Sequence, residues 1–167
     1  MPLHLYLGDI TKMKTDAIVN AANTDLKPYP GICEAVFQAA GEEELEKACR
    51  EIGHCAISRA VVTPGYRLPA KYIIHVAGPG WYGGAGRERF LMAACYQHAL
   101  QKAVMYRCRS ISFPLIFSGD CHIPRAESLK IAGNVIREFL KYHEMEVYLV
   151  LYKHGIYEMA RILLGET

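Results

Sequence analysis

The chain has 167 residues, of which 51% are hydrophobic, so it has the length of one domain and enough apolar residues to bury a core of its own. Its 19 basic and 17 acidic residues give a formal net charge of +2, without the concentrated basic face of a nucleic-acid-binding surface. No apolar run approaches the roughly 20 residues that a membrane helix needs, so nucleic-acid and membrane partners are not expected.

Short runs rich in β-branched and aromatic residues alternate with longer segments whose apolar residues recur at helical spacing. The expected strands are, in chain order, residues 3–7, 17–19, 60–63, 72–76, 111–113 and 147–152. The expected helices begin near Gly31, at Gly41, near Arg87, at Pro124 and near Ile156. Strands that alternate with helices predict a sheet with helices on both faces, and we expect a single domain over residues 1–167.

The six cysteines stand at positions 33, 49, 55, 95, 108 and 121. None of them forms a Cys-x-x-Cys pair, and the residues before Leu3 do not resemble a signal peptide, so the pattern does not suggest a secreted disulfide framework. We therefore expect free thiols and a cytoplasmic location.

The loops that follow the strands are where we expect the chemistry, because open α/β sheets bind ligands beyond the carboxyl ends of their strands. Gly8-Asp9-Ile10 follows the first expected strand, and Asn20-Ala-Ala-Asn23 follows the second. Two further loops, residues 30–33 and 118–124, each lead into an expected helix. Helix N-termini offer free backbone N–H groups to anions, so two such loops at one crevice suit a pyrophosphate.

One glycine-rich segment could be mistaken for a dinucleotide-binding loop. Gly78-Pro-Gly-Trp-Tyr-Gly83 fits the Gly-x-Gly-x-x-Gly pattern and follows an expected strand. The next helical segment starts only near Arg87, no acidic residue lies about 20 positions further on, and Pro79 removes an N–H from the turn. A Rossmann-type site is therefore disfavoured, and His75 in the preceding strand is interpreted as a structural histidine rather than a base.

Taken together, these segments resemble the macro domain family. The matching segments follow the family's order over nearly the whole chain, and they are Gly8–Thr11, Asp16–Asn23, Ala39–Gly41, Thr63–Tyr66, Leu68–His75, Gly78–Trp81, Cys95-Tyr96, Ser110–Pro114 and Gly119–Pro124. The resemblance implies a three-layer α/β/α sandwich with a mixed central sheet of about six strands. It also implies that the ligand is ADP-ribose or a close relative, either free or attached to a protein, and no cofactor is implied.

The resemblance also implies roles by position. Asp9 would accept a hydrogen bond from the adenine amino group with Ile10 beside it, and Tyr152 would pack on the adenine ring. Asn23 would hold the distal ribose, while Asn20 would brace the loop, because buried amides have to be satisfied. The phosphates would be wrapped by the backbone of Gly31, Ile32, Ser118, Gly119, Asp120 and Cys121.

Both phosphate loops depart from the family pattern. Hydrolytic members carry a glycine run followed by Val-Asp-Gly, whereas this chain has Pro-Tyr-Pro-Gly-Ile-Cys-Glu over residues 28–34. Cys33 therefore stands at the position of the aspartate that activates water. In the second loop, Cys121 stands where an aromatic residue normally lies against the distal ribose, His122 replaces a glycine, and Asp120 brings a negative charge near the phosphates.

These departures leave the activity open. One interpretation is a binding module with weak or no hydrolase activity. The alternative is an enzyme that removes ADP-ribose from acidic side chains or deacetylates O-acetyl-ADP-ribose, with Cys33 or the adjacent Glu34 as the candidate catalytic residue. A thiol-based or metal-dependent chemistry at Cys33, Cys121 and His122 is a third interpretation, but three ligands without a fourth are too few for a zinc site, and we expect no metal.

Overall fold

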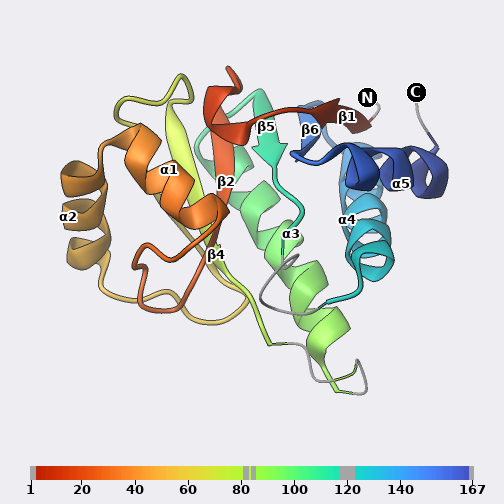
Figure 1. The fold of residues 1–167 in the computed structure, drawn as a ribbon, viewed down its shortest axis with the longest axis horizontal. Coiled ribbons are helices and arrows are strands. Elements are labelled where there is room, and N and C mark those ends of the chain that lie inside the picture. The colour runs from red at the N-terminus through yellow and green to blue at the C-terminus, as the bar shows by residue number, and fades with distance from the viewer. Residues whose placement is uncertain (1–2, 81–82, 84–85, 117–122, 166–167) are drawn as a thin grey trace.

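The computed structural model describes residues 3–80, 83, 86–116 and 123–165. Within these residues a six-stranded sheet forms the centre of the molecule, in the strand order β1-β6-β5-β2-β4-β3 (Figure 1). The strands are β1 (Leu3–Leu7), β2 (Ala17–Ala22), β3 (Ala60–Pro64), β4 (Tyr72–Ala77), β5 (Ser110–Phe113) and β6 (Glu146–Leu151). Neighbouring strands are parallel except β3, which runs antiparallel to β4 at one edge. The expected mixed sheet is therefore confirmed.

Helices cover both faces of this sheet. Those in the described residues are η1 (Ile10–Lys12, a 3-10 helix), α1 (Ile32–Ala40), α2 (Glu42–Ile52), α3 (Glu88–Met105), α4 (Arg125–Leu140) and α5 (His154–Leu164). The core on one face receives α1 and α2, and the core on the other face receives α3, α4 and α5. None of the described helices is both long and apolar enough to cross a membrane.

The two cores follow from the strand geometry. Ile73 and Ile74 are neighbours in β4 and both are at most 1% exposed, yet they belong to different cores, because successive strand side chains point to opposite faces of the sheet. Phe37 and Leu45 pack with Ile73, whereas Tyr96 packs on the face of Ile74. Strands covered on both faces carry nearly continuous apolar sequences, and such apolar runs predicted β4 and β6 from the sequence.

Strand β2 is longer than the sequence suggested. The sequence predicts a strand that ends at Val19, followed by a loop that starts at Asn20, but β2 continues to Ala22. The residues Asn20 to Ala22 pair in parallel register with His75 to Ala77 of β4. Pairing with a neighbouring strand satisfies these backbone groups, so tertiary context outweighs the low strand propensity of asparagine.

The described cysteines are Cys33, Cys49, Cys55, Cys95 and Cys108, and all five are buried free thiols. Burial raises the pKa of Cys49 and of Cys108 to about 11. These thiols are therefore protonated at neutral pH, and a protonated thiol is neither a nucleophile nor a metal ligand. Cys121 lies outside the described residues.

Candidate binding site

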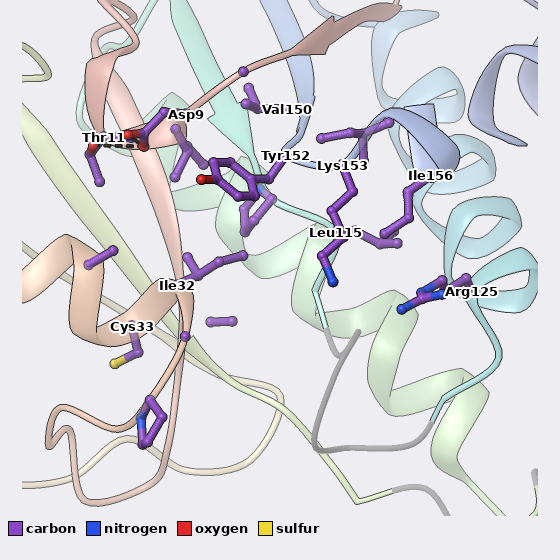
Figure 2. A pocket seen from close by; sticks show the side chains of 18 of the residues that line it. Asp9, Thr11, Ile32, Cys33, Leu115, Arg125, Val150, Tyr152, Lys153 and Ile156 are labelled. Carbon is purple, nitrogen blue, oxygen red and sulfur yellow. Dashed lines mark hydrogen bonds between the residues drawn. The ribbon is translucent and has the colours of Figure 1, made fainter. Parts of the chain in front are cut away.

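A cavity of about 500 Å³ opens beyond the carboxyl ends of β1, β2, β5 and β6 (Figure 2). Its size is typical of a small-molecule site, and its position is the one at which open α/β sheets bind ligands. Its lining residues in the described part of the chain are Gly8, Asp9, Ile10, Thr11, Ala21, Tyr29, Pro30, Gly31, Ile32, Cys33, Ala35, Pro114, Leu115, Arg125, Val150, Leu151, Tyr152, Lys153 and Ile156.

Asp9 lies at one end of the cavity, directly before η1. Its Oδ1 accepts hydrogen bonds from the backbone N–H of Thr11 at 2.9 Å and from Thr11 Oγ1 at 2.7 Å, and so caps η1. Its Oδ2 makes no hydrogen bond to any other described residue, and the side chain is half-buried. Asp9 can therefore accept a hydrogen bond from a ligand while it keeps its capping role.

Tyr152 is the first residue after β6, because that strand ends at Leu151 rather than at Tyr152 as the sequence suggested. Its side chain lines the cavity although it is 76% exposed. Figure 2 shows the ring reaching across the cavity with its hydroxyl toward the wall that carries Asp9. An exposed aromatic ring of this kind offers one face to a planar ligand ring.

The N-terminus of α1 forms a second part of the wall. Gly31 is its N-cap, with a φ of 104° that favours glycine, and no side chain caps the helix. The N–H groups of Ile32 and Cys33 belong to the first turn and have no carbonyl partner within the helix. This end of the cavity therefore presents free donors, which suit an anionic group.

The thiol of Cys33 is turned away from this cavity. Cys33 is 2% exposed, and Figure 2 shows the sulfur pointing away from Ile32 and Tyr152. Asn20 Nδ2 donates to the sulfur at 3.6 Å, and the thiol lies 3.8 Å from the carbonyl oxygen of Lys27, to which it donates. Burial raises the pKa of the Cys33 thiol, so at neutral pH it holds its proton.

A buried chain of polar side chains runs from Cys33 into the sheet. Asn20 is fully buried, and its Nδ2 also donates to His75 Nδ1 at 3.0 Å. His75 Nε2 lies 3.0 Å from Thr63 Oγ1. The structure therefore places Asn20 beneath the loop that precedes α1, where it contacts Cys33 rather than the cavity. Its Oδ1 is buried without a hydrogen-bond partner among the described residues.

The structure does not bring the other candidate side chains of this region into the cavity wall. Both ends of the Asn23 amide are engaged by Lys27, with Nδ2 donating to its carbonyl at 2.8 Å and Oδ1 accepting from its N–H at 3.1 Å. Glu34 Oε1 accepts a hydrogen bond from Gln38 Nε2 at 3.2 Å. Neither Asn23 nor Glu34 is among the described lining residues, so their roles with a ligand stay predictions.

The second phosphate loop was also expected to contribute to this site. Its candidate residues lie outside the described residues, and they are Ser118, Gly119, Asp120, Cys121 and His122.

Sequence reasoning missed two cations that line the cavity. Arg125 is the first residue of α4, and Lys153 is the N-cap of α5. Arg125 directly follows Pro124, the expected start of a helix, and Lys153 directly follows Tyr152, a candidate site residue. These neighbouring positions were the signal by which the sequence could have indicated both cations. Isolated cations are common on protein surfaces, so the sequence alone does not distinguish Arg125 and Lys153 from the others.

The family model described as Macro domain matches residues 19–132, which is more than half of the chain. The chain is 45% identical over 138 residues to a macro domain-containing protein of Chlorobaculum tepidum, with 83% of this chain and 80% of the relative covered. It is 42% identical over 170 residues to an O-acetyl-ADP-ribose deacetylase of Citrobacter rodentium, with 98% and 96% covered. The chain belongs to the Macro domain family.

Solved structures with the same fold carry related ligands. A mutant of the Oceanobacillus iheyensis macrodomain, solved with ADPR, is 35% identical with a TM-score of 0.93, covering 97% of this chain and 91% of that one. The Trypanosoma brucei macrodomain in complex with ADP-ribose is 30% identical with a TM-score of 0.88, covering 98% and 69%. The fold of this chain is therefore the macro domain fold.

Proposed function

We propose that this chain binds ADP-ribose or a related ADP-ribose derivative in the cavity at the carboxyl ends of the strands. The observation that carries the proposal is that one cavity has groups suited to adenine at one end and groups suited to a pyrophosphate at the other. At one end, Asp9 offers a carboxylate oxygen and Tyr152 an aromatic face, which suit an adenine amino group and ring. At the other end, the uncapped N-terminus of α1 suits a pyrophosphate. The related macrodomains solved with ADPR and ADP-ribose support this assignment.

In this proposal, the chain is a binding module that binds this ligand and has weak or no hydrolase activity. The resemblance to the family implies that hydrolytic members carry, at the position of Cys33, an aspartate that activates water. The Cys33 thiol is buried and protonated, and a protonated thiol does not take up a proton. No carboxylate replaces it among the described lining residues that α1 and its preceding loop contribute, and Glu34 is hydrogen-bonded to Gln38.

The alternative function is that of an O-acetyl-ADP-ribose deacetylase or ADP-ribosyl hydrolase. The 42% identity to the Citrobacter rodentium O-acetyl-ADP-ribose deacetylase, over nearly the full length of both chains, favours it. Calorimetric titration with ADP-ribose, followed by turnover assays on a mono-ADP-ribosylated protein and on O-acetyl-ADP-ribose, separates the two. Binding without turnover supports the module, turnover supports the enzyme, and a native protein that does not bind ADP-ribose contradicts both.

Replacing Asp9 with alanine tests the adenine end of the cavity. We expect Asp9→Ala to weaken ADP-ribose binding by about 1–3 kcal/mol, the cost of leaving a buried donor of the ligand unpaired. Thr11→Val is the matched control, because it removes one hydrogen bond to Asp9 Oδ1 and leaves Oδ2 in place. Calorimetry measures both variants, and an equal loss in Thr11→Val would assign the effect to η1 instead of the adenine contact.

Tyr152→Ala tests the stacking surface separately. Stacking of a base on an aromatic side chain contributes about 1–3 kcal/mol, so we expect ADP-ribose affinity to fall by that amount. Because Tyr152 is 76% exposed, the free energy of unfolding should hardly change. Tyr142, which is 77% exposed and does not line the cavity, supplies the control variant Tyr142→Ala. Affinity that survives in Tyr152→Ala would place the adenine elsewhere.

A further inference from the structure

Arg125 and Lys153 are two cations that share one wall of the cavity and come from different elements. Both residues are exposed, and within the described part of the chain neither forms an ion pair. The only acidic residue among the described lining residues is Asp9, whose Oδ1 is occupied by Thr11. The described lining therefore carries two uncompensated positive charges on one side.

Both cations stand where the backbone disfavours them. Arg125 begins α4 and Lys153 is the N-cap of α5, and cations at a helix N-terminus interact unfavourably with the helix dipole. No side chain caps either helix. The first turn of α5 contains no acidic residue, and Glu127 in the first turn of α4 forms an ion pair with Arg89. Two helix dipoles and two side-chain charges thus add up to a positive potential on this wall, which an anion relieves.

The position of this wall relative to the proposed adenine site limits what the anion can be. Lys153 directly follows Tyr152, the ring proposed to stack on adenine, and Figure 2 shows Lys153, Arg125 and Ile156 on the side of the cavity opposite Cys33 and the start of α1. The N-terminus of α1 already offers donors to a pyrophosphate. The part of the ligand that remains beside Tyr152 is the ribose that carries the adenine.

We propose that Arg125 and Lys153 bind a phosphate monoester on the adenine-linked ribose, so that the preferred ligand is an ADP-ribose phosphorylated at its 2′ or 3′ hydroxyl. The inference rests on the proposed function and specifies the class of ligand, namely ADP-ribose with a phosphate monoester on its adenine-linked ribose. A phosphate monoester carries close to two negative charges at neutral pH, which matches one arginine and one lysine. The guanidinium binds phosphate through paired N–H donors, and the ammonium acts as a point charge.

Calorimetric titration compares ADP-ribose with its 2′-phosphate and its 3′-phosphate on the native protein. We expect one of the phosphorylated ligands to bind at least about tenfold more tightly, since a charge-assisted hydrogen bond contributes that much, and whichever isomer is preferred identifies the hydroxyl. The preference should shrink as salt is added, because exposed charges are screened. Titrations that compare adenosine 2′,5′-bisphosphate and adenosine 3′,5′-bisphosphate with AMP repeat the test on ligands that lack the distal ribose and the phosphate attached to it.

Because it should weaken binding of the phosphorylated ligand more than binding of ADP-ribose, the double variant Arg125→Gln/Lys153→Gln should lose the preference. Lys130→Gln, which removes an exposed charge of α4 outside the described lining, should keep it. Tight ADP-ribose binding without any preference would overturn this inference and leave the proposed function intact. Equal weakening of all ligands in the double variant would also overturn it, because the cations would then serve the pyrophosphate. Absence of ADP-ribose binding to the native protein would refute the proposed function itself.

Discussion

Replacing Cys33 with aspartate is expected to raise the rate at which this protein releases ADP-ribose from a glutamate-modified protein by at least about tenfold. A positioned general base typically contributes about 10²–10⁴-fold. Only part of that range is expected, because the side chain at position 33 has to turn toward the cavity before a carboxylate there can act on water. The second phosphate loop also departs from the pattern of hydrolytic family members. The native protein should be a poor hydrolase, since its Cys33 thiol is protonated and faces away from the cavity.

The surroundings of Cys33 determine how an introduced carboxylate would behave. Asn20 Nδ2, now 3.6 Å from the sulfur, can donate to a carboxylate oxygen, whereas the Lys27 carbonyl 3.8 Å away would repel it. Burial disfavours the charged form of a carboxyl group and so raises its pKa, toward the neutral range where a general base works best. A raised pKa also means that the variant loses stability, relative to the native protein, as the pH rises from about 4 to neutrality.

The measurement is release of ADP-ribose by native, Cys33→Asp and Cys33→Asn proteins. Asparagine has nearly the shape of aspartate but cannot accept the proton, so Cys33→Asn separates repacking from base catalysis. A gain in Cys33→Asp that Cys33→Asn does not share assigns the effect to the carboxylate. Should the native protein already turn over as fast as Cys33→Asp, position 33 does not limit catalysis, and a loss of activity in Glu34→Gln would then identify Glu34 as the base.

The sequence predicted those parts of the fold that depend on local patterns. Residues 3–7 form a strand as expected, and α2 begins after Gly41, where three glutamates occupy the first turn and complement the helix dipole. Asn20 shows where local patterns fail. The sequence predicts that the strand ends at Val19, and asparagine has a low strand propensity, yet β2 includes Asn20 and pairs it with His75 of β4. The partner strand lies more than 50 residues away in the chain, so no local window contains the cause.

Some residues of the candidate site could likewise be predicted from the sequence, and others could not, because their positions depend on tertiary packing. Asp9 could be found because it follows a predicted strand, and residues at the carboxyl ends of parallel strands meet at one edge of a sheet. Tyr152 was predicted as the last residue of a strand, and its role followed from the resemblance to the macro domain family. The direction of the Cys33 side chain could not be found, because it depends on how α1 packs against β2. Arg125 was missed for a related reason, since its place at the cavity follows from where α4 starts in space.

Acidification is expected to destabilise this protein between pH 6.5 and about 4 through one histidine. His75 is fully buried, and burial lowers its pKa from the ordinary 6.5 to about 4. In that interval the unfolded chain binds a proton at this position and the folded chain does not, so the free energy of unfolding falls as the pH falls. Each unit of pKa difference corresponds to about 1.4 kcal/mol, and the loss attributable to His75 is therefore about 3 kcal/mol at pH 4.

Urea unfolding of native and His75→Gln proteins at pH 7 and pH 4.5 measures this contribution. Glutamine carries an amide and does not titrate, so its variant should start less stable and lose less on acidification. Carboxylates that titrate in the same range act on both proteins and cancel in the comparison. An equal loss of stability in the two proteins would assign the pH dependence to other groups and contradict the prediction.

The hydrogen bonds of His75 explain why its protonation would also reach the cavity. Nδ1 accepts a hydrogen bond from Asn20 Nδ2, and a protonated imidazole carries hydrogen on both ring nitrogens, so two donors would then face each other inside the core. Asn20 is the residue that holds Cys33 at the start of α1. Displacement of Asn20 would disturb the helix N-terminus that we propose as the pyrophosphate site. We therefore expect the affinity for ADP-ribose to fall over the same pH interval as the stability, and to fall less in His75→Gln.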